Sequence, residues 1–292
     1  MVAGIKRQLL GAAIAAVMLL TACAGSGTDA DTAKTSAISE ITDTSAAVSL
    51  TEEQTEPAAA GTTASEAEKE SVTSMETTAR KIPEGAKVIA LTFDDGPNTS
   101  VTVDVLDKLE KYNVVGSFFL IGQNITPLSA QSVKRAAEMG CDIENHSWTH
   151  RYMNTLTAEE IKKEIEDTSD KIYEITGRYP QFFRPPFIVV NDTMFDNIDL
   201  PFICGIHGED WDRTVTAEQR AERILKQAKD GAIVLLHDMP GNDATVEALD
   251  TIIPELQAQG YELVTISQLF EAKGITPSAD KNIVYSFADQ TE

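Results

Sequence analysis

The side chains best suited to chemistry stand in short clusters between apolar stretches. The adjacent carboxylates Asp94 and Asp95 precede Gly96, and His146 and His150 stand four residues apart. Two neighbouring carboxylates can divide roles, because one can bind a cation while the other stays free as a base. Carboxylate and imidazole groups are also ordinary ligands of divalent transition metals. These residues therefore predict metal-assisted or general acid–base chemistry.

Three further clusters lie downstream and contribute a guanidinium, an aromatic ring and a lone imidazole. They are Arg184-Pro185-Pro186-Phe187, Asp210-Trp211 and Leu235-Leu236-His237-Asp238. Every histidine of the chain falls in or beside a cluster: His146, His150, His207 and His237. Random placement would rarely produce this distribution, so we expect the clusters to form one site.

Each cluster alone has an ordinary structural explanation. Asp-Asp-Gly is a common turn, because Asp caps its own backbone and Gly accepts a positive φ. Arg184 could be a surface cation, Trp211 a core aromatic and His237 a hydrogen-bonded core histidine. The histidine pair is not the helical metalloprotease motif, since Ser147 stands where that motif has a glutamate base. The order of the clusters favours a functional site more than any one of them does.

Short apolar runs alternate with amphipathic segments from Lys87 onward and predict strands. The predicted strands are Val88–Phe93, Val115–Leu120, Cys141–Asn145, Phe182–Arg184, Phe202–Ile206, Ala232–His237 and Glu262–Ile266. Strands in series with helices favour a mostly parallel α/β sheet. Their number suggests a barrel, with a doubly wound open sheet as the alternative. The clusters follow the strands, at the carboxyl ends where barrels carry their reactive residues.

The segments between the strands predict helices. Thr157 with Glu160, and Thr216 with Gln219, have the spacing of capping boxes that begin a helix. The predicted helices cover residues 101–111, 128–139, 157–175, 216 to about 231, and 244–259.

In this order, TFDDG, HSWTH, RPPF, DW and LLH resemble the motif series of the polysaccharide deacetylase family, also called the NodB-homology or carbohydrate esterase family 4 domain. The resemblance covers about residues 85–270. It implies a distorted (β/α)7-8 barrel, a divalent metal and hydrolysis of N- or O-acetyl groups on glycans. Zn²⁺ is the expected metal, with Co²⁺ or another divalent ion as the alternative.

The resemblance also implies roles for individual residues. Asp95, His146 and His150 would bind the metal, and Asp94 would be the general base, oriented by Arg184.

The resemblance further implies that the metal and the backbone N–H of Phe187 would hold the oxyanion, and that His237 would protonate the leaving amine. Leu235 and Trp211 would wall the pocket for the acetyl methyl group.

One departure from the family concerns the acid. The family usually has an Asp four residues before the Trp, to pair with the acid histidine, and this sequence has His207 there. A second imidazole beside His237 would oppose its protonation, which predicts an activity optimum at lower pH. Asp210, Glu209 or Asp238 could supply the carboxylate instead.

A second departure follows Phe187, where the family commonly has Gly and this sequence has Ile188, then Val189 and Val190. These β-branched side chains are expected to narrow or reshape the substrate groove.

The N-terminus predicts export. Lys6 and Arg7 precede an apolar run, Leu9 to Leu20, that is shorter than the ~20 residues of a spanning helix. Leu20-Thr21-Ala22-Cys23 resembles a bacterial lipobox, which implies a signal peptide over 1–22 and lipidation of Cys23. A simple signal peptide cut near Ala24 is the alternative. We expect an extracytoplasmic protein, lipid-anchored to the bacterial cell membrane.

Composition divides the rest of the chain. Residues 23–81 are rich in Thr, Ser, Ala and Glu and lack aromatic residues, which predicts a disordered tether. We assign residues 82–272 to a single catalytic domain and 273–292 to a C-terminal tail. Cys141 and Cys204 could pair in an extracellular setting or remain free.

The formal net charge of −22 argues against nucleic acid as a partner. An acetylated glycan is the expected partner, together with the membrane through the lipid, and no protein partner is implied. The leading interpretation is removal of N-acetyl groups from peptidoglycan or an N-acetylglucosamine polymer. The alternatives are a catalytically weak glycan-binding lipoprotein and an O-acetyl esterase acting on xylan-type glycans.

Overall fold

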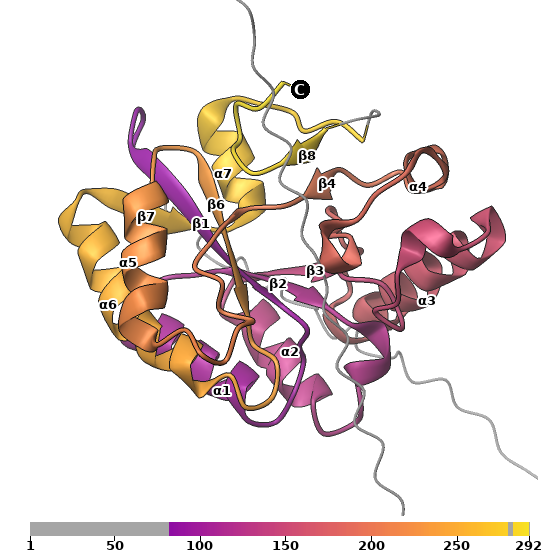
Figure 1. The fold of residues 1–292 in the computed structure, drawn as a ribbon, viewed down its shortest axis with the longest axis horizontal. Coiled ribbons are helices and arrows are strands. Elements are labelled where there is room, and N and C mark those ends of the chain that lie inside the picture. The colour runs from indigo at the N-terminus through magenta and orange to yellow at the C-terminus, as the bar shows by residue number, and fades with distance from the viewer. Residues whose placement is uncertain (1–81, 280–282, 292) are drawn as a thin grey trace, which may run out of the picture. The chain divides into compact units, whose positions relative to one another are not determined.

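A computed structural model describes residues 82–279 and 283–291 of the chain (Figure 1). The predicted signal peptide, Cys23 and the tether lie outside the described residues. Within the described ranges, no helix combines the length and the apolar character needed to cross a membrane.

A parallel sheet forms the centre of the fold. Its strands are β1 (Lys87–Asp94), β2 (Ser117–Leu120), β3 (Asp142–Asn145), β5 (Ile206–His207), β6 (Ala232–His237) and β7 (Tyr261–Val264). The hydrogen-bonded order is β3-β2-β1-β6-β5, and β7 pairs with the first half of β1. Every pairing in this sheet is parallel, so the predicted parallel α/β fold is confirmed.

The predicted barrel is not confirmed, because the described strands form two separate sheets that only isolated bridges connect. The predicted strand Phe182–Arg184 is reduced to isolated bridges from Phe183 to Asn145 and Phe202. The predicted strand Phe202–Ile206 is split between β4 (Phe202–Ile203) and β5.

The split has a physical cause at Gly205. A Cβ added there would lie 2.9 Å from the carbonyl oxygen of Ile233, so the chain can pass this close to β6 only without a side chain. Before that point, the N–H of Cys204 donates to Tyr285 O at 2.8 Å, and β4 pairs with β8 (Val284–Tyr285) as a separate sheet.

Helices connect the strands and cover the sheet. They are α1 (Val101–Lys111), α2 (Ala130–Glu138), α3 (Ala158–Thr176), α4 (Asp192–Asn197), α5 (Ala217–Gln227), α6 (Asp243–Ala258) and α7 (Ile266–Lys273), with 3-10 turns η1 (Gly122–Asn124), η2 (Met153–Thr155) and η3 (Pro186–Ile188). Both predicted capping boxes are present, at Thr157/Glu160 and Thr216/Gln219. Figure 1 shows α5 and α6 side by side, and α6 lies next to β7.

The core follows from the two faces of β1. Ile89, Leu91 and Phe93 point into the larger apolar cluster, with side chains of α1, α5 and α6. Val88 and Ala90 point into a second cluster, with side chains of α7 and β8. Because both faces of the strand are buried, its sequence is a nearly continuous apolar run rather than an alternating one.

The segment predicted to be a tail packs against the domain. Tyr285 and Ala288 are buried in the second cluster, and Figure 1 shows β8 in yellow beside β4. The two described cysteines, Cys141 and Cys204, are free rather than paired. Burial raises the pKa of the Cys141 thiol to about 12, so it is an unreactive core side chain.

Candidate active site

The parallel strands bring the predicted site residues to one edge of the sheet. Asp94 ends β1 and stands opposite His237, which ends β6, in the β1–β6 register. His146 directly follows β3, and His207 ends β5. Sequence clusters far apart in the chain therefore meet at the carboxyl ends of the strands, as predicted.

Asp95, His146 and His150 form a cluster suited to a metal ion. Asp95 Oδ1 lies 3.5 Å from His146 Nε2 and 3.3 Å from His150 Nε2. The three ligand atoms all lie within 4.8 Å of one another. Asp95 Oδ1 is buried and has no hydrogen-bond partner, so a cation would satisfy it. The cluster fits one divalent metal.

The protonation states also fit. Burial acts to raise the pKa of Asp95, but the close approach and charge of His146, with the charges of His237 and His150, lower it to about 2. Burial and the charge of His146 lower the pKa of His150. An ionised carboxylate and a neutral imidazole are the forms that bind a metal.

The second ring nitrogen of His146 is fixed by the backbone. Its Nδ1 lies 2.7 Å from the carbonyl oxygen of Arg184, which leaves Nε2 facing Asp95. A hydrogen bond of this kind sets the tautomer and direction of a metal-binding imidazole.

The loop that carries both histidines has an unusual backbone. Ser147 and His150 have φ values of 66° and 56°, and Asp95 has 76°. Such conformations cost roughly 1–3 kcal/mol each and persist where surrounding contacts impose them. Here Asn145 Oδ1 accepts from Ser147 N at 2.8 Å, and Ser147 Oγ accepts from His150 N at 3.0 Å.

Glu164 of α3, which the sequence analysis missed, supports the same loop. Its buried carboxylate accepts hydrogen bonds from the N–H groups of Trp148 and Thr149, at 2.8 and 2.7 Å. It also accepts from Thr149 Oγ1 at 2.7 Å and Arg151 Nε at 3.1 Å. The available signal was a carboxylate on the buried face of an amphipathic helix, in line with Ile161 and Thr168.

The predicted base, Asp94, forms a buried ion pair with Arg184. Arg184 Nη1 donates to Asp94 Oδ1 at 2.5 Å, and Asp94 Oδ2 lies 3.8 Å from His146 Nε2. Arg184 is itself held by Thr92 Oγ1 at 2.7 Å and Cys204 O at 2.6 Å. The predicted orientation of Asp94 by Arg184 is therefore present, with the second carboxylate oxygen facing the metal cluster.

The predicted acid, His237, has a carboxylate partner in Asp210. His237 Nδ1 lies 2.8 Å from Asp210 Oδ1, and Asp210 Oδ2 accepts from the backbone N–H of His237 at 2.7 Å. Burial acts to lower the pKa of His237, but Asp210, with the charges of Asp94 and Asp95, raises it to about 9. A proton donor is thus available at neutral pH.

This geometry corrects the expectation about His207. The His207 ring packs against Trp211 with ring centroids 4.7 Å apart, and Asp210 supplies the carboxylate for His237. The basis for a lowered pH optimum is therefore lost, because that expectation required His237 to lack a carboxylate partner. Of the other candidates, Glu209 pairs with Arg223.

Asp238 holds the loop that carries Asp94 and Asp95. Its buried carboxylate accepts from Gly96 N at 3.0 Å and from Thr102 Oγ1 at 2.5 Å. Burial raises the pKa of Asp238 to about 7. A Cβ at Gly96 would lie 2.5 Å from Asp238 Oδ2, which explains why glycine follows the two carboxylates.

The predicted walls of the pocket differ in exposure. Phe187 and Trp211 are 50% and 46% exposed, whereas Leu235 is buried in β6 opposite His207. Phe187 and Ile188 have φ values of 59° and 56°, in the region that favours glycine. Among the described residues, the N–H of Phe187 donates no backbone–backbone hydrogen bond. An oxyanion donor must be free in this way.

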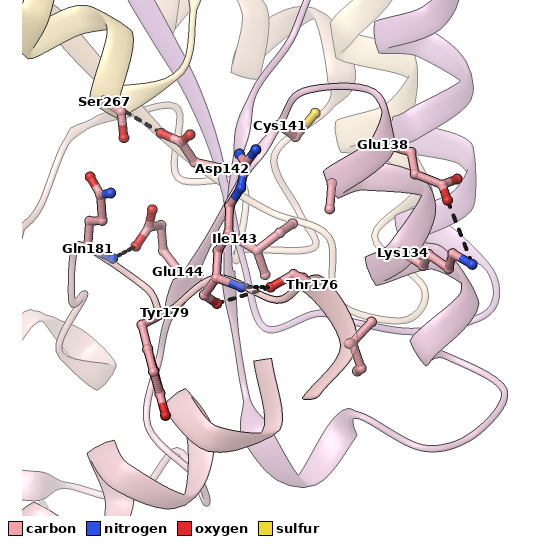
Figure 2. Close-up of a pocket in the computed structure, with 13 residues that line it drawn as sticks. Lys134, Glu138, Cys141, Asp142, Ile143, Glu144, Thr176, Tyr179, Gln181 and Ser267 are labelled. Atoms are coloured by element: carbon pink, nitrogen blue, oxygen red, sulfur yellow. Dashed lines mark hydrogen bonds and ion pairs between the residues drawn. The ribbon is translucent and has the colours of Figure 1, made fainter. Parts of the chain in front are cut away.

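The cavity shown in Figure 2 lies elsewhere. It has a volume of about 410 Å³ beside the start of β3, and its lining includes Asp142, Glu144 and Tyr179. Burial raises the pKa of Glu144 well above its usual range, and its carboxylate accepts from the N–H groups of Gln181 and Phe182. None of the predicted site residues lines this cavity.

One edge of the α/β sheet thus gathers a carboxylate oriented by an arginine, three possible metal ligands and an imidazole with a raised pKa, a set suited to metal-assisted hydrolysis. Residues 81–199 match the family model for polysaccharide deacetylases. The chain belongs to this family, which confirms the resemblance found in the sequence.

Known relatives act on different glycans. The chain is 51% identical over 197 residues to a bifunctional xylanase/deacetylase of Pseudobutyrivibrio xylanivorans. The match covers 68% of this chain and 33% of that protein. It is 39% identical over 199 residues to the peptidoglycan-N-acetylglucosamine deacetylase PgdA of Listeria monocytogenes. This match covers 66% of this chain and 42% of that protein. The chain thus matches less than half the length of these relatives.

A solved structure is similar over its whole length. A family 4 acetyl xylan esterase from Clostridium thermocellum, in complex with cobalt, has a TM-score of 0.68 and 42% identity to this chain. The match covers 70% of this chain and 100% of that one.

Proposed function

We propose that this protein is a metal-dependent deacetylase that removes N-acetyl groups from a cell-envelope polysaccharide, peptidoglycan or an N-acetylglucosamine polymer. One observation carries the proposal. The cluster of Asp95, His146 and His150 shares one sheet edge with a carboxylate base, Asp94, and with an acid, His237, whose raised pKa keeps it protonated. Amide hydrolysis needs both groups, because an amine leaves only when it is protonated.

The residues of the chain would divide the reaction as follows. Asp95, His146 and His150 would hold a divalent cation, most suitably Zn²⁺, which would polarise the acetyl carbonyl and acidify the attacking water. Asp94 would accept the proton of that water, while Arg184 orients its carboxylate by donating to Oδ1.

The remaining charges develop on the substrate. The N–H of Phe187 would donate to the carbonyl oxygen as it gains negative charge. His237 would pass the proton on its other ring nitrogen to the leaving amine, and Asp210 would stabilise the charged ring before transfer.

The substrate assignment draws on the relatives and on the predicted anchor. Likeness to a peptidoglycan deacetylase and the lipobox at Cys23 favour an envelope glycan. The bifunctional xylanase/deacetylase and the acetyl xylan esterase favour O-acetylated xylan as a second candidate. We further propose that the protein is extracytoplasmic and anchored through lipidated Cys23.

Acetate release tests the proposal. The full-length protein, loaded with Zn²⁺, is compared on N-acetylglucosamine oligomers, peptidoglycan and acetylxylan. We expect faster release from the amide substrates, loss on chelation with recovery on adding metal, and loss of at least about 1000-fold in Asp94→Asn.

Asp107→Asn, an exposed carboxylate change on α1, is the matched control and should leave the rate unchanged. Faster release from acetylxylan would favour the second candidate. No release from any of these glycans, by a folded and metal-loaded protein, would contradict enzymatic function and favour a glycan-binding role.

A further inference from the structure

Aromatic rings continue outward from the metal-type cluster. The rings of His146 and His150 have centroids 4.8 Å apart, and those of His150 and Phe187 are 4.7 Å apart. Tyr152 then stacks on Phe187 at 4.2 Å, with an angle of 20° between the ring planes. The series begins at a buried ring and ends at the surface, since Phe187 is 50% and Tyr152 is 53% exposed.

The exposed pair is held in place by the chain. Tyr152 precedes η2, and its carbonyl oxygen accepts from Thr155 N at 3.2 Å and from Thr155 Oγ1 at 2.7 Å. The next residue, Met153, is buried and fixes the turn to the core. Phe187 sits in a left-handed backbone conformation, with φ of 59°.

Packing does not account for this arrangement. A strained backbone costs roughly 1–3 kcal/mol, and it normally persists where contacts or function require it. Phe187 nevertheless keeps half of its surface in water, and so does the ring stacked on it. Exposed apolar patches beside a reactive site commonly bind ligands.

We infer that the stacked pair Tyr152 and Phe187 is a binding subsite for a pyranose ring next to the sugar that loses its acetyl group. This inference rests on the proposed function. The apolar C–H face of a pyranose matches the face of an aromatic ring, and the tyrosine hydroxyl can hydrogen-bond a sugar hydroxyl.

The position of the pair fits a neighbouring sugar. Trp211 lies beside the proposed acid, with its ring centroid 5.8 Å from that of His237. Tyr152 instead lies beyond Phe187, on the side of His150. We expect a glycan whose acetamide lies beside the acid to place a neighbouring sugar on Tyr152, so that the subsite favours polymers over single sugars.

Another pair of tyrosines provides a matched control. Tyr173 and Tyr179 stack at 4.4 Å, with an angle of 15°, and are 45% and 57% exposed. They lie at the end of α3, and Tyr179 lines the cavity in Figure 2 rather than the site. Their stacking geometry and exposure are similar to those of Tyr152 and Phe187, but no ring contact connects them to His150.

The experiment measures kcat and KM for the full-length, zinc-loaded protein on N-acetylglucosamine oligomers of increasing length, and on acetylated xylo-oligomers. We expect Tyr152→Ala to raise KM about 5- to 10-fold on long oligomers, with kcat nearly unchanged and no effect on the shortest substrate. Tyr152→Leu should raise KM by as much, because leucine is apolar but has no flat ring on which a sugar can stack. Tyr152→Phe should retain most of the affinity, and Tyr179→Ala all of it.

Two results would overturn the subsite. One is an unchanged KM in Tyr152→Ala on every oligomer, and the other is an equal rise in Tyr179→Ala. The proposed function can fail separately, as an absence of acetate release by the wild type. In that case calorimetry measures the binding of the oligomers instead. Weaker binding by Tyr152→Ala but not by Tyr179→Ala supports the subsite, and binding by Tyr152→Ala equal to that of the wild type contradicts it.

Discussion

The pairing of Asp94 with Arg184 sets the chemistry at the scale of single residues. Both side chains are buried, and Arg184 has no water-exposed surface. A buried charge is tolerated only when it is paired, so each member depends on the other. The same pair that orients the proposed base therefore contributes to folding.

Removing the guanidinium should show this dependence. We expect Arg184→Met to destabilise the protein by about 3–5 kcal/mol, because Asp94 would remain buried and unpaired. The double variant Asp94→Asn/Arg184→Met should recover part of that loss while remaining inactive. Urea unfolding measures the free energies, and a double variant as unstable as the single one would show that the charge is not the cause.

The pair of His237 and Asp210 predicts a pH dependence. The pKa of His237 is about 9 in the folded protein, above the ordinary value of 6.5. A raised pKa contributes stability that is complete below pH 6.5 and is lost as the pH rises through about 9. The contribution is roughly 3 kcal/mol at most.

Unfolding of the chelator-treated protein between pH 6 and 9.5 tests this dependence against Asp210→Asn. We expect the stability of the wild type to fall over this range, and that of the variant to be lower at pH 6 and nearly constant. Parallel curves for the two proteins would contradict the assignment. The imidazole resonances of His237 should titrate at a pH about two units lower in the variant, because the carboxylate that favours the charged ring is gone.

At the scale of elements, α3 supports the loop that carries the metal-type histidines. Glu164 of α3 accepts four hydrogen bonds from this loop, two of them from backbone N–H groups. The loop backbone is strained at Ser147 and His150, so these bonds oppose its relaxation.

We expect Glu164→Gln to weaken zinc binding by about 10- to 100-fold, the usual effect of removing a residue that supports metal ligands. The amide has one oxygen left to accept bonds and brings donors where the loop already donates. Calorimetric titration with Zn²⁺ gives the affinity without relying on turnover. Glu166→Gln, an exposed change on the same helix, is the control, and equal affinities in the two variants would refute a supporting role for Glu164.

Sequence reasoning located the elements whose signals are local. The apolar runs of β1, β2, β3 and β6 identified strands, and two capping boxes identified the starts of α3 and α5. The break between β4 and β5 could not be predicted, since it depends on pairing with β8, a two-residue strand far along the chain.

The site shows the same division. Asp95, His146, His150 and Asp94 were found because their motifs are short and lie at strand ends. The sequence does not distinguish Asp210 from Glu209 and Asp238 as the partner of His237, because the pairing depends on how β5 and β6 bring two loops together.

At the scale of the whole molecule, the formal charge of −22 leaves few means of binding an anionic surface. Association with the membrane is therefore expected to require covalent lipid, as the lipobox predicts. In a bacterial host, Cys23→Ala should abolish incorporation of labelled palmitate and release the protein from the membrane fraction. Labelling that persists in the variant would refute lipidation at this residue.

The pairing of β8 with β4 connects the far end of the chain to the proposed base. Tyr285 O accepts from Cys204 N, Cys204 O accepts from Arg184, and Arg184 holds Asp94. Shortening the chain to the boundary of family similarity near residue 270 would remove the first link. A trimmed protein could then fold yet lose turnover, so residues through 291 belong in any version made for crystallisation or assay.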